Sequence, residues 1–389
     1  MLFLVKILKM RLFIICLLFG MVCSCSLKKQ DGIDIETGIE HLSRDLKCSD
    51  FITHIEYIPL QTTDDILIND NPTIVVVDKY IIVKTIKECF LFSKDTGKFI
   101  RKVGNYGNGP GEYHSTSGFI NPTKKTIYFA GWNSVLMEFS FDGEYISSIK
   151  IPGYNDSFTS PSSPTNHIYW NDYFVSYFTN SIGIEKKLIQ IFDHNGEIIK
   201  VIPNRNVYMD TKNFSFTTGE SDFYYYDNNL FFKETYSDTI FKISDQVFSP
   251  HIIFHTGKYS KPYESKWLPL EKRGQYINLR KINETPLFIF FKVFDDERQI
   301  FGLYNKKNER LKMAERKYVE NDVDYFLPFS PESLSDIGEG VSFIEAYQVV
   351  QWFSENSEKA DKLPEHLKKL SNVKETDNQV VLIAKLKEF

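Results

Sequence analysis

Cysteine is scarce in this chain, and the scarcity excludes the thiol-rich classes of site. Five of the 389 residues are cysteines, and no two of them form a CxxC motif. A structural zinc site or a thioredoxin-type redox centre is built on closely spaced pairs, so neither is expected. Cys48 and Cys89 are the two cysteines farthest from the N-terminus. In an exported protein they could form a disulfide or stay as two free, partly buried thiols, and the sequence leaves both options open.

Basic clusters and catalytic signatures are missing as well. The formal net charge is −5, and no run of Lys and Arg stands out against it, so nucleic acid is not an expected partner. Nothing resembles HExxH, GxSxG or an EF-hand loop. His251 and His255 are four residues apart, but on a strand their Cα atoms would be about 13 Å apart, too far to share one metal ion. The sequence therefore predicts no catalytic residue, no metal site and no cofactor.

The N-terminus carries a short apolar run. Lys6, Lys9 and Arg11 precede Leu12–Val22, which is about half the length of a membrane-spanning helix. A basic start, an apolar core of about eleven residues and a small residue before a cleavage point describe an export signal. Translation could begin at Met1 or at Met10, because Met10 and Arg11 in front of the apolar run make a sufficient signal.

The residues that follow resemble the signal-peptidase site of bacterial lipoproteins. In Val22-Cys23-Ser24-Cys25 a small residue precedes the last cysteine. By this resemblance residues 1–24 are the signal peptide and Cys25 is the lipidated N-terminus of the mature chain. An ordinary secretory signal is the alternative. Residues 25–50 are polar and charged, so we expect a lipidated, flexible tether that leads to a folded body.

A strand, a polar turn with glycine and a second strand recur three times. The copies span Phe92–Ile100, Phe139–Ile146 and Phe192–Ile199, and their glycines, Gly97, Gly143 and Gly196, lie 46 and 53 residues apart. This spacing is typical of one four-stranded propeller blade. The stretch from about residue 51 to 350 therefore holds six blades.

The strands of the blades are expected where short β-rich runs alternate with Asn, Asp, Gly and Pro. The expected runs include 74–77, 80–83, 89–93, 98–103, 126–130, 135–139, 144–149, 168–170, 173–178, 188–192, 198–202, 223–226, 230–234, 239–243, 251–254, 288–293 and 299–304. Residues 51–389 would form one domain, in which 351–389 is a closing segment of helix and strand. Gly340–Phe353 should be a strand followed by a short helix, and Pro364–Leu370 another short helix. We expect Gln379–Leu386 to be buried and to pair near Ile55–Leu60, because a propeller usually joins both chain ends in one blade.

Several motifs spread along the chain carry a family resemblance. They are Gly104–Tyr113, Asp238–Ile243, Gly257–Tyr259 and Thr376–Asn378. With these motifs the chain resembles the six-bladed β-propeller lipoproteins of Bacteroidota, relatives of NHL and TolB-like propellers. The resemblance implies an all-β fold, export, and a lipid anchor in the outer membrane, facing either the periplasm or the cell surface.

Candidate ligand-binding residues come from the loops. Gly104–Gly111 is rich in glycine but lacks the GK[ST] ending and the following helix of a phosphate loop, so it is expected to connect two blades. Glu112 and Tyr113 end this loop and are candidates to line a face of the disc, with a structural hydrogen bond as the other reading. The remaining candidates lie close to predicted turns and are Trp132, Asn133 and Tyr226. Exposed aromatic rings stack on sugars and anchor protein partners, whereas packing between blades is their other common use.

These observations favour a binding or scaffold module at the cell envelope, with a glycan, a peptide or an envelope protein as its partner. One alternative is a propeller enzyme, a lactonase or a glycan-processing hydrolase, with Ca²⁺ or paired carboxylates in the central channel. Another is a purely structural partner in an envelope complex, which would show a large exposed apolar patch. The fold by itself does not choose among them.

Overall fold

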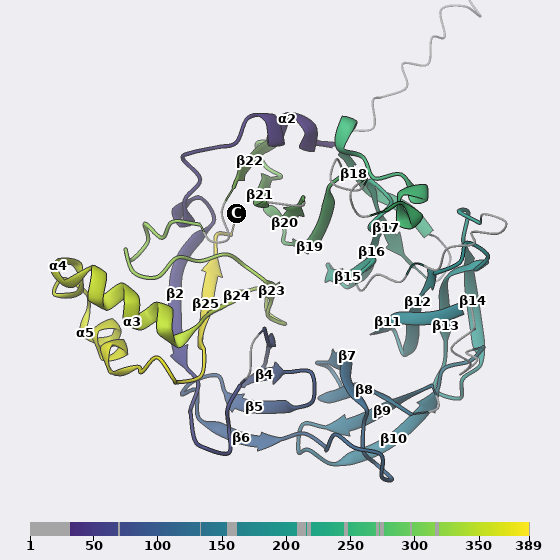
Figure 1. The fold of residues 1–389 in the computed structure, drawn as a ribbon, viewed down its shortest axis with the longest axis horizontal. Helices are drawn as coiled ribbons and strands as arrows, with labels where there is room; N and C mark the ends of the chain where they lie inside the picture. The colour runs from purple at the N-terminus through teal and green to yellow at the C-terminus, as the bar shows by residue number, and fades with distance from the viewer. Residues whose placement is uncertain are drawn as a thin grey trace, which may run out of the picture.

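The computed structural model describes residues 32–388, apart from 69–70, 133, 154–161, 208–214, 216–218, 245–247, 270–271, 273–275, 296–297 and 316–318. Its strands form six small antiparallel sheets around a central axis, which is the expected six-bladed β-propeller (Figure 1). The expected signal peptide (residues 1–24) and Cys25, the expected lipidation site, lie outside the described residues.

Blades 1 to 5 each take their strands in sequence order, with the first strand nearest the axis (Figure 1). Blade 1 consists of β3 (Thr73–Val77), β4 (Tyr80–Lys84), β5 (Cys89–Ser93) and β6 (Phe99–Lys102). Blade 2 consists of β7 (Ser115–Asn121), β8 (Thr126–Gly131), β9 (Val135–Ser140) and β10 (Tyr145–Lys150). Blade 3 consists of β11 (Ser162–Trp170), β12 (Tyr173–Asn180), β13 (Lys187–Phe192) and β14 (Ile198–Pro203). Blade 4 consists of β15 (Ser221–Tyr226), β16 (Asn229–Glu234), β17 (Thr239–Ile243) and β18 (Phe248–His255). Blade 5 consists of β19 (Asn278–Glu284), β20 (Phe288–Phe294), β21 (Gln299–Asn305) and β22 (Arg310–Ala314).

Blade 6 closes the ring with strands from both ends of the chain. It contains β23 (Ser333–Leu334), β24 (Gly340–Ile344), β25 (Val380–Leu386) and, at its outer edge, β2 (Ile52–Pro59). Tyr57 lies opposite Leu382 in the antiparallel pair β2–β25. Every residue of β25 except Lys385 is buried. The expected pairing of the last strand with the first is thus confirmed, and it ties the termini together without a covalent link.

Residues 32–50 differ from the tether that was expected over 25–50. β1 (Ile33–Asp34) adds in parallel to the outer edge of blade 4, and α2 (Ile35–Glu40) follows it. Ile35 and Ile39 are buried against blades 4 and 5, and Cys48 is buried near Phe51. The polar composition of this segment concealed a few apolar side chains at the right spacing, and their burial holds the segment against the propeller.

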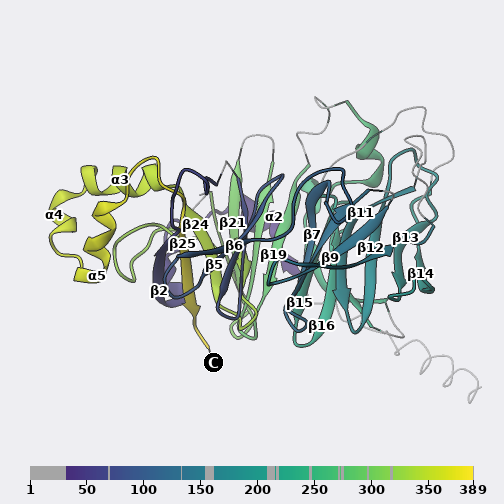
Figure 2. The same cartoon turned by 90° about the horizontal axis from the view of Figure 1, so that it is seen from below.

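A helical module projects from the rim between β24 and β25 (Figures 1 and 2). It contains α3 (Ala346–Glu355), α4 (Ser357–Ala360) and α5 (Glu365–Lys368), and this confirms the expected strand, helix and closing strand. Trp352 and Phe353 pack on Phe326, with ring centroids 4.6 and 5.4 Å apart. The short 3₁₀ segments are η1 (Cys48–Asp50), η2 (Gly257–Tyr259), η3 (Tyr263–Trp267) and η5 (Lys369–Asn372).

The two cysteines among the described residues are free thiols in different parts of the core. Cys48 packs beside blades 5 and 6, and Cys89 lies inside blade 1. Burial raises the pKa of Cys89 to about 12 and also raises the pKa of Cys48. Both are therefore protonated and inert at neutral pH. In the part of the chain that the structure describes, no helix combines the length and apolar character that a membrane crossing requires.

Candidate functional site

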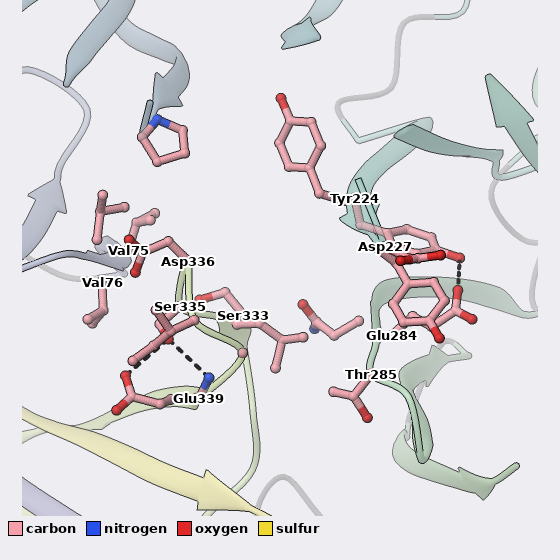
Figure 3. Close-up of a pocket in the computed structure, with 18 of the residues that line it drawn as sticks. Val75, Val76, Tyr224, Asp227, Glu284, Thr285, Ser333, Ser335, Asp336 and Glu339 are labelled. Atoms are coloured by element: carbon pink, nitrogen blue, oxygen red, sulfur yellow. Dashed lines mark hydrogen bonds between the residues drawn. The ribbon is translucent and has the colours of Figure 1, made fainter. Parts of the chain in front are cut away.

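A cavity of about 1570 Å³ occupies the central axis. All six blades line it, mostly through their first strands and the turns that follow them, and blade 6 adds residues of β25 and β2, among them Lys385 and Glu56. Figure 3 shows Tyr224, Asp227 and Glu284 on one wall and Val75, Ser333 and Asp336 on the opposite wall. The cavity is large enough for a small molecule or a short polymer.

The turns at the cavity owe their shape to asparagine and aspartate. Asn171 and Asp172 have φ values of 47° and 65°, and Asp227 and Asn228 have 49° and 56°. Two consecutive residues with positive φ make the two-residue hairpin that suits the twist of paired strands, and Asn and Asp tolerate this conformation best after glycine. The same residues bring polar side chains to the cavity, so the local turn chemistry also sets the chemistry of the site.

The lining is rich in carboxylates. Seven acidic residues and three lysines line the cavity, and the acidic ones are Glu56, Asp172, Asp227, Glu284, Asp336, Glu339 and Glu388. The lysines are Lys124, Lys385 and Lys387. Carboxylates therefore outnumber lysines in the lining, and this excess favours cationic groups and hydroxyl donors over free anions.

Glu284 is the most constrained of these carboxylates. Its side chain is 1% exposed, and it accepts a hydrogen bond from the Tyr224 hydroxyl at 2.8 Å (Figure 3). Lys306 Nζ lies 2.6 Å from Oε1, and His251 Nε2 lies 3.0 Å from Oε2. Burial acts to raise the pKa of Glu284, but the hydrogen bonds with His251 and Lys306 outweigh it, so the pKa is lowered. Glu284 is thus a fixed anion that ties blade 4 to blade 5.

The wall formed by blades 6 and 1 holds its carboxylates in a similar way. Glu339 accepts a hydrogen bond from Ser335 at 3.0 Å (Figure 3) and pairs with Lys94 at 2.6 Å. Asp336 accepts a hydrogen bond from the backbone N–H of Asp78 at 3.0 Å. Asp227 differs, because its exposed carboxylate has no hydrogen bond or ion pair among the described residues. Asp227 is therefore an available acceptor on the wall of the cavity.

Between blades 2 and 3 a cation meets an aromatic ring. Lys124 Nζ lies 3.5 Å from Oδ1 of Asp172 and 4.9 Å from the ring centroid of Tyr169. The Tyr169 hydroxyl donates to Asp172 at 2.8 Å. Tyr225, which is 43% exposed, adds an aromatic face to the cavity beside these hydrogen-bonding groups.

Of the five candidate ligand residues, the structure brings Tyr226 to the cavity. Its ring lies 4.1 Å from Lys306 Nζ, beside the Glu284 cluster. Glu112, Tyr113 and Trp132 are not part of the lining. Asn133 lies outside the described residues.

The other three candidates support the loop that contains the glycines. Glu112 accepts a hydrogen bond from the backbone N–H of Gly109 at 2.7 Å, and the exposed Trp132 donates to the Gly107 carbonyl at 3.0 Å. Tyr113 is buried, and its hydroxyl donates to the Lys87 carbonyl at 3.0 Å. A role of these residues in ligand binding stays a prediction.

Sequence reasoning missed Asp227, Glu284 and Asp336. The dipeptides Asn171-Asp172 and Asp227-Asn228 carried a usable signal, because each stands between two β-rich runs where a two-residue hairpin is expected. Nothing comparable marks Glu284, whose partners come from other strands. Among the described residues, no three His, Cys, Asp or Glu side chains are arranged so that they could hold a metal ion.

Comparison with known proteins adds a family and a fold relative. The family described as "Domain of unknown function (DUF4934)" matches residues 31–385. A crystal structure of a candidate exported protein from Bacteroides fragilis NCTC 9343 is similar, with 17% sequence identity and a TM-score of 0.68. The similarity covers 89% of this chain and 98% of that one. At this identity the similarity bears on the fold alone.

Two further structures are much less similar. BamB from Moraxella catarrhalis has 9% identity and a TM-score of 0.33, over 80% of this chain and 71% of that one. The extracellular domain of a candidate one-component system from Bacteroides thetaiotaomicron has 10% identity and a TM-score of 0.38, over 74% of this chain and 32% of that one. Both scores are too low to bear on the fold. None of the curated proteins matches this sequence significantly.

Proposed function

The chain belongs to the family described as Domain of unknown function (DUF4934), and we propose that it is an exported, lipid-anchored propeller that binds a ligand in its central channel at the cell envelope. The single observation that carries the binding role is the cavity of about 1570 Å³, which all six blades line with aromatic rings, carboxylates and amides. Such a lining offers several convergent contacts to one ligand.

The proposed location at the cell envelope rests on the N-terminal sequence. The apolar run Leu12–Val22 and Cys25 support export and lipidation, with the outer membrane as the anchoring membrane. The Bacteroides fragilis protein of the same fold, named a candidate exported protein, agrees with this proposal. A relationship to NHL and TolB-like propellers, carried by motifs such as Gly104–Tyr113, is part of the same proposal.

The lining favours a glycan as the ligand. Tyr225 offers a ring face on which a sugar can stack, and Asp227 offers an acceptor for sugar hydroxyls. The excess of carboxylates over lysines in the cavity also suits a ligand rich in hydroxyl donors.

Calorimetric titration of residues 26–389 with a panel of neutral and acidic oligosaccharides tests this function. Tyr225→Ala and Asp227→Ala should each weaken binding by about tenfold or more, since each removes a stacking face or a charged acceptor. Tyr145→Ala is the matched control, because Tyr145 is as exposed as Tyr225, 45% against 43%, but lies on the outer strand β10. If Tyr145→Ala were the only one of the three variants to weaken binding, the result would contradict a binding site in the channel.

Analysis of the oligosaccharide after incubation with the protein distinguishes binding from catalysis. Mass spectrometry of the oligosaccharide after incubation should find it unchanged, with or without added Ca²⁺. A shortened oligosaccharide would replace the binding role by the alternative of a glycan-processing enzyme. A lactone that is incubated with the protein in the same way and found opened would replace it by a lactonase.

A further inference from the structure

A second, smaller cavity adjoins the central channel. It has a volume of about 100 Å³ and lies where blades 5, 6 and 1 meet. Val75 and Ser333 line both cavities, so the small one is a side pocket of the channel. Its polar lining is Thr73, Lys281, Glu332, Ser333 and Ser342, and the rest is apolar.

Lys281 is held in this pocket by an unusual backbone. Its φ of 56° is in the left-handed region, which is rare for a long side chain. The register of β19 against β20 shifts between Arg280 and Asn283, so Lys281 lies in a β-bulge. Bulges redirect side chains, and strained conformations of this kind gather at functional sites. The distortion places an ammonium group where a regular strand would not.

The ammonium group of Lys281 is only weakly paired with Glu332. Glu332 is the acidic group of the pocket, and it already forms a close ion pair with the buried Lys292. Lys281 Nζ stands 4.0 Å from Glu332, at the outer limit of an ion pair. The Lys281 side chain is 48% exposed and is held only loosely by Glu332, so its ammonium group can turn to a further anionic group.

A buried hydroxyl in the same pocket lacks a partner. Ser342 is 1% exposed, and its Oγ makes no hydrogen bond among the described residues. A buried hydroxyl without a partner costs free energy, so it is usually matched by a ligand or an ordered water. Ser342 and Lys281 come from different blades and both line this one small space.

We propose that this side pocket binds the carboxylate of an acidic sugar whose ring lies in the central channel. The inference rests on the proposed function and narrows its ligand to an acidic glycan. Lys281 and Ser342 donate to the carboxylate, and the ring lies in the channel beside Val75 and Ser333. The acidic channel repels anions elsewhere, so the carboxylate has one favourable position, which sets the orientation of the sugar.

The size and lining of the pocket favour a carboxylate over a phosphate. Half of the lining is apolar, namely Pro72, Ile74, Val75, Val341 and Phe343. A carboxylate carries a single negative charge, so one lysine can compensate for the loss of its hydration in this pocket. A phosphate carries a charge of about −1.5 to −2 and needs more donors.

Glucuronate and glucose are matched probes, because they differ in one carboxylate. Calorimetry should find that glucuronate binds about tenfold more tightly than glucose, and Lys281→Gln should abolish this preference. Lys359→Gln removes an exposed lysine on α4 and is the control for net charge, so it should keep the preference. Ser342→Ala should also weaken glucuronate binding while the melting temperature without ligand stays equal or rises, a combination that a merely structural hydroxyl would not produce.

The outcomes separate this inference from the proposed function. Binding of neutral oligosaccharides that depends on Tyr225 and Asp227, without a preference for glucuronate, would overturn the side pocket and leave the channel function standing. Propionate binding that depends on Lys281, without any oligosaccharide binding, would support the pocket and overturn the channel function. Inorganic phosphate that competes as well as propionate, or a pocket in a glucuronate-soaked crystal that holds water alone, would overturn the carboxylate assignment.

Discussion

The ammonium group of Lys266 lies 2.7 Å from Oε2 of Glu220, and the two side chains are 0% and 1% exposed. Lys266 belongs to η3, in the long connection between blades 4 and 5, and Glu220 directly precedes β15. Thr179 of blade 3 donates to the same carboxylate oxygen at 2.6 Å and accepts from Lys266 at 3.0 Å. One buried ion pair therefore joins the connection to blades 3 and 4.

Removing one partner of this pair should be costly. Lys266→Met leaves the Glu220 carboxylate buried without its cation, and we expect a loss of about 3–5 kcal/mol in the free energy of unfolding by urea titration. The double variant Lys266→Met with Glu220→Gln should recover part of the loss. Lys258→Met is the control, because Lys258 pairs with Glu40 at the surface and such pairs contribute less than about 1 kcal/mol. If Lys266→Met and Lys258→Met lowered the free energy of unfolding equally, the buried ion pair would contribute no more to stability than the surface pair, which would contradict this prediction.

The pKa of Glu234 predicts that the stability of the fold falls as the pH rises. Burial raises the pKa of Glu234 from 4.5 to about 7, and the Tyr177 hydroxyl donates to its Oε1 at 2.9 Å. The folded state therefore binds more protons than the unfolded state between these values. Stability should fall as the pH rises from about 4.5 to about 7, by on the order of 3 kcal/mol for this one group.

The variant Glu234→Gln should remove this fall. The quantity to follow is the difference in unfolding free energy between the natural chain and the variant across pH 4 to 8. The difference is needed because His167 acts in the opposite direction, since burial lowers its pKa from 6.5 to about 4. A difference that does not change with pH would contradict the raised pKa of Glu234.

Alanine substitutions at two glycines with positive φ distinguish the cost of backbone strain from the cost of steric conflict. A Cβ on Gly97 would collide with the Pro59 carbonyl, whereas a Cβ on Gly338 would meet no atom within 4 Å. Gly338→Ala should cost about 1–2 kcal/mol, the usual penalty for a left-handed alanine. Gly97→Ala should cost about 1–3 kcal/mol more, because the turn or β2 must move. Equal melting temperatures of the two variants would show that the close approach to Pro59 does not matter.

Glu112 offers a test of loop support against ligand binding. Its carboxylate accepts the Gly109 N–H, and it lies outside the channel lining. Glu112→Ala should lower the unfolding free energy by about 1–2 kcal/mol and leave oligosaccharide affinity unchanged. Glu112→Gln keeps an acceptor oxygen and should lose less. A loss of affinity in calorimetry with an unchanged melting temperature would instead assign Glu112 to a binding site.

Much of the fold was predictable because propeller blades repeat a local pattern. Gly97, Gly143 and Gly196 all have positive φ, as the recurring turns require. The first strand of blade 2, β7, was missed, because Ser115–Asn121 is polar and contains glycine. It becomes a strand through pairing with β8, where Gly118 lets the backbone approach closely. Tertiary pairing thus overrode a weak local preference.

The amino-acid sequence by itself determined the blade spacing, the turns and the pairing of the last strand with the first. These features depend on residues that are close in sequence, or on an apolar strand that must find a partner. Only the tertiary structure decided that residues 32–50 pack on the propeller, that Glu284 meets His251 and Lys306, and that Lys281 and Ser342 share a side pocket. Such encounters join side chains from different strands or blades. Their distances depend on strand register and on the rotation of each blade about the axis, which no local pattern encodes.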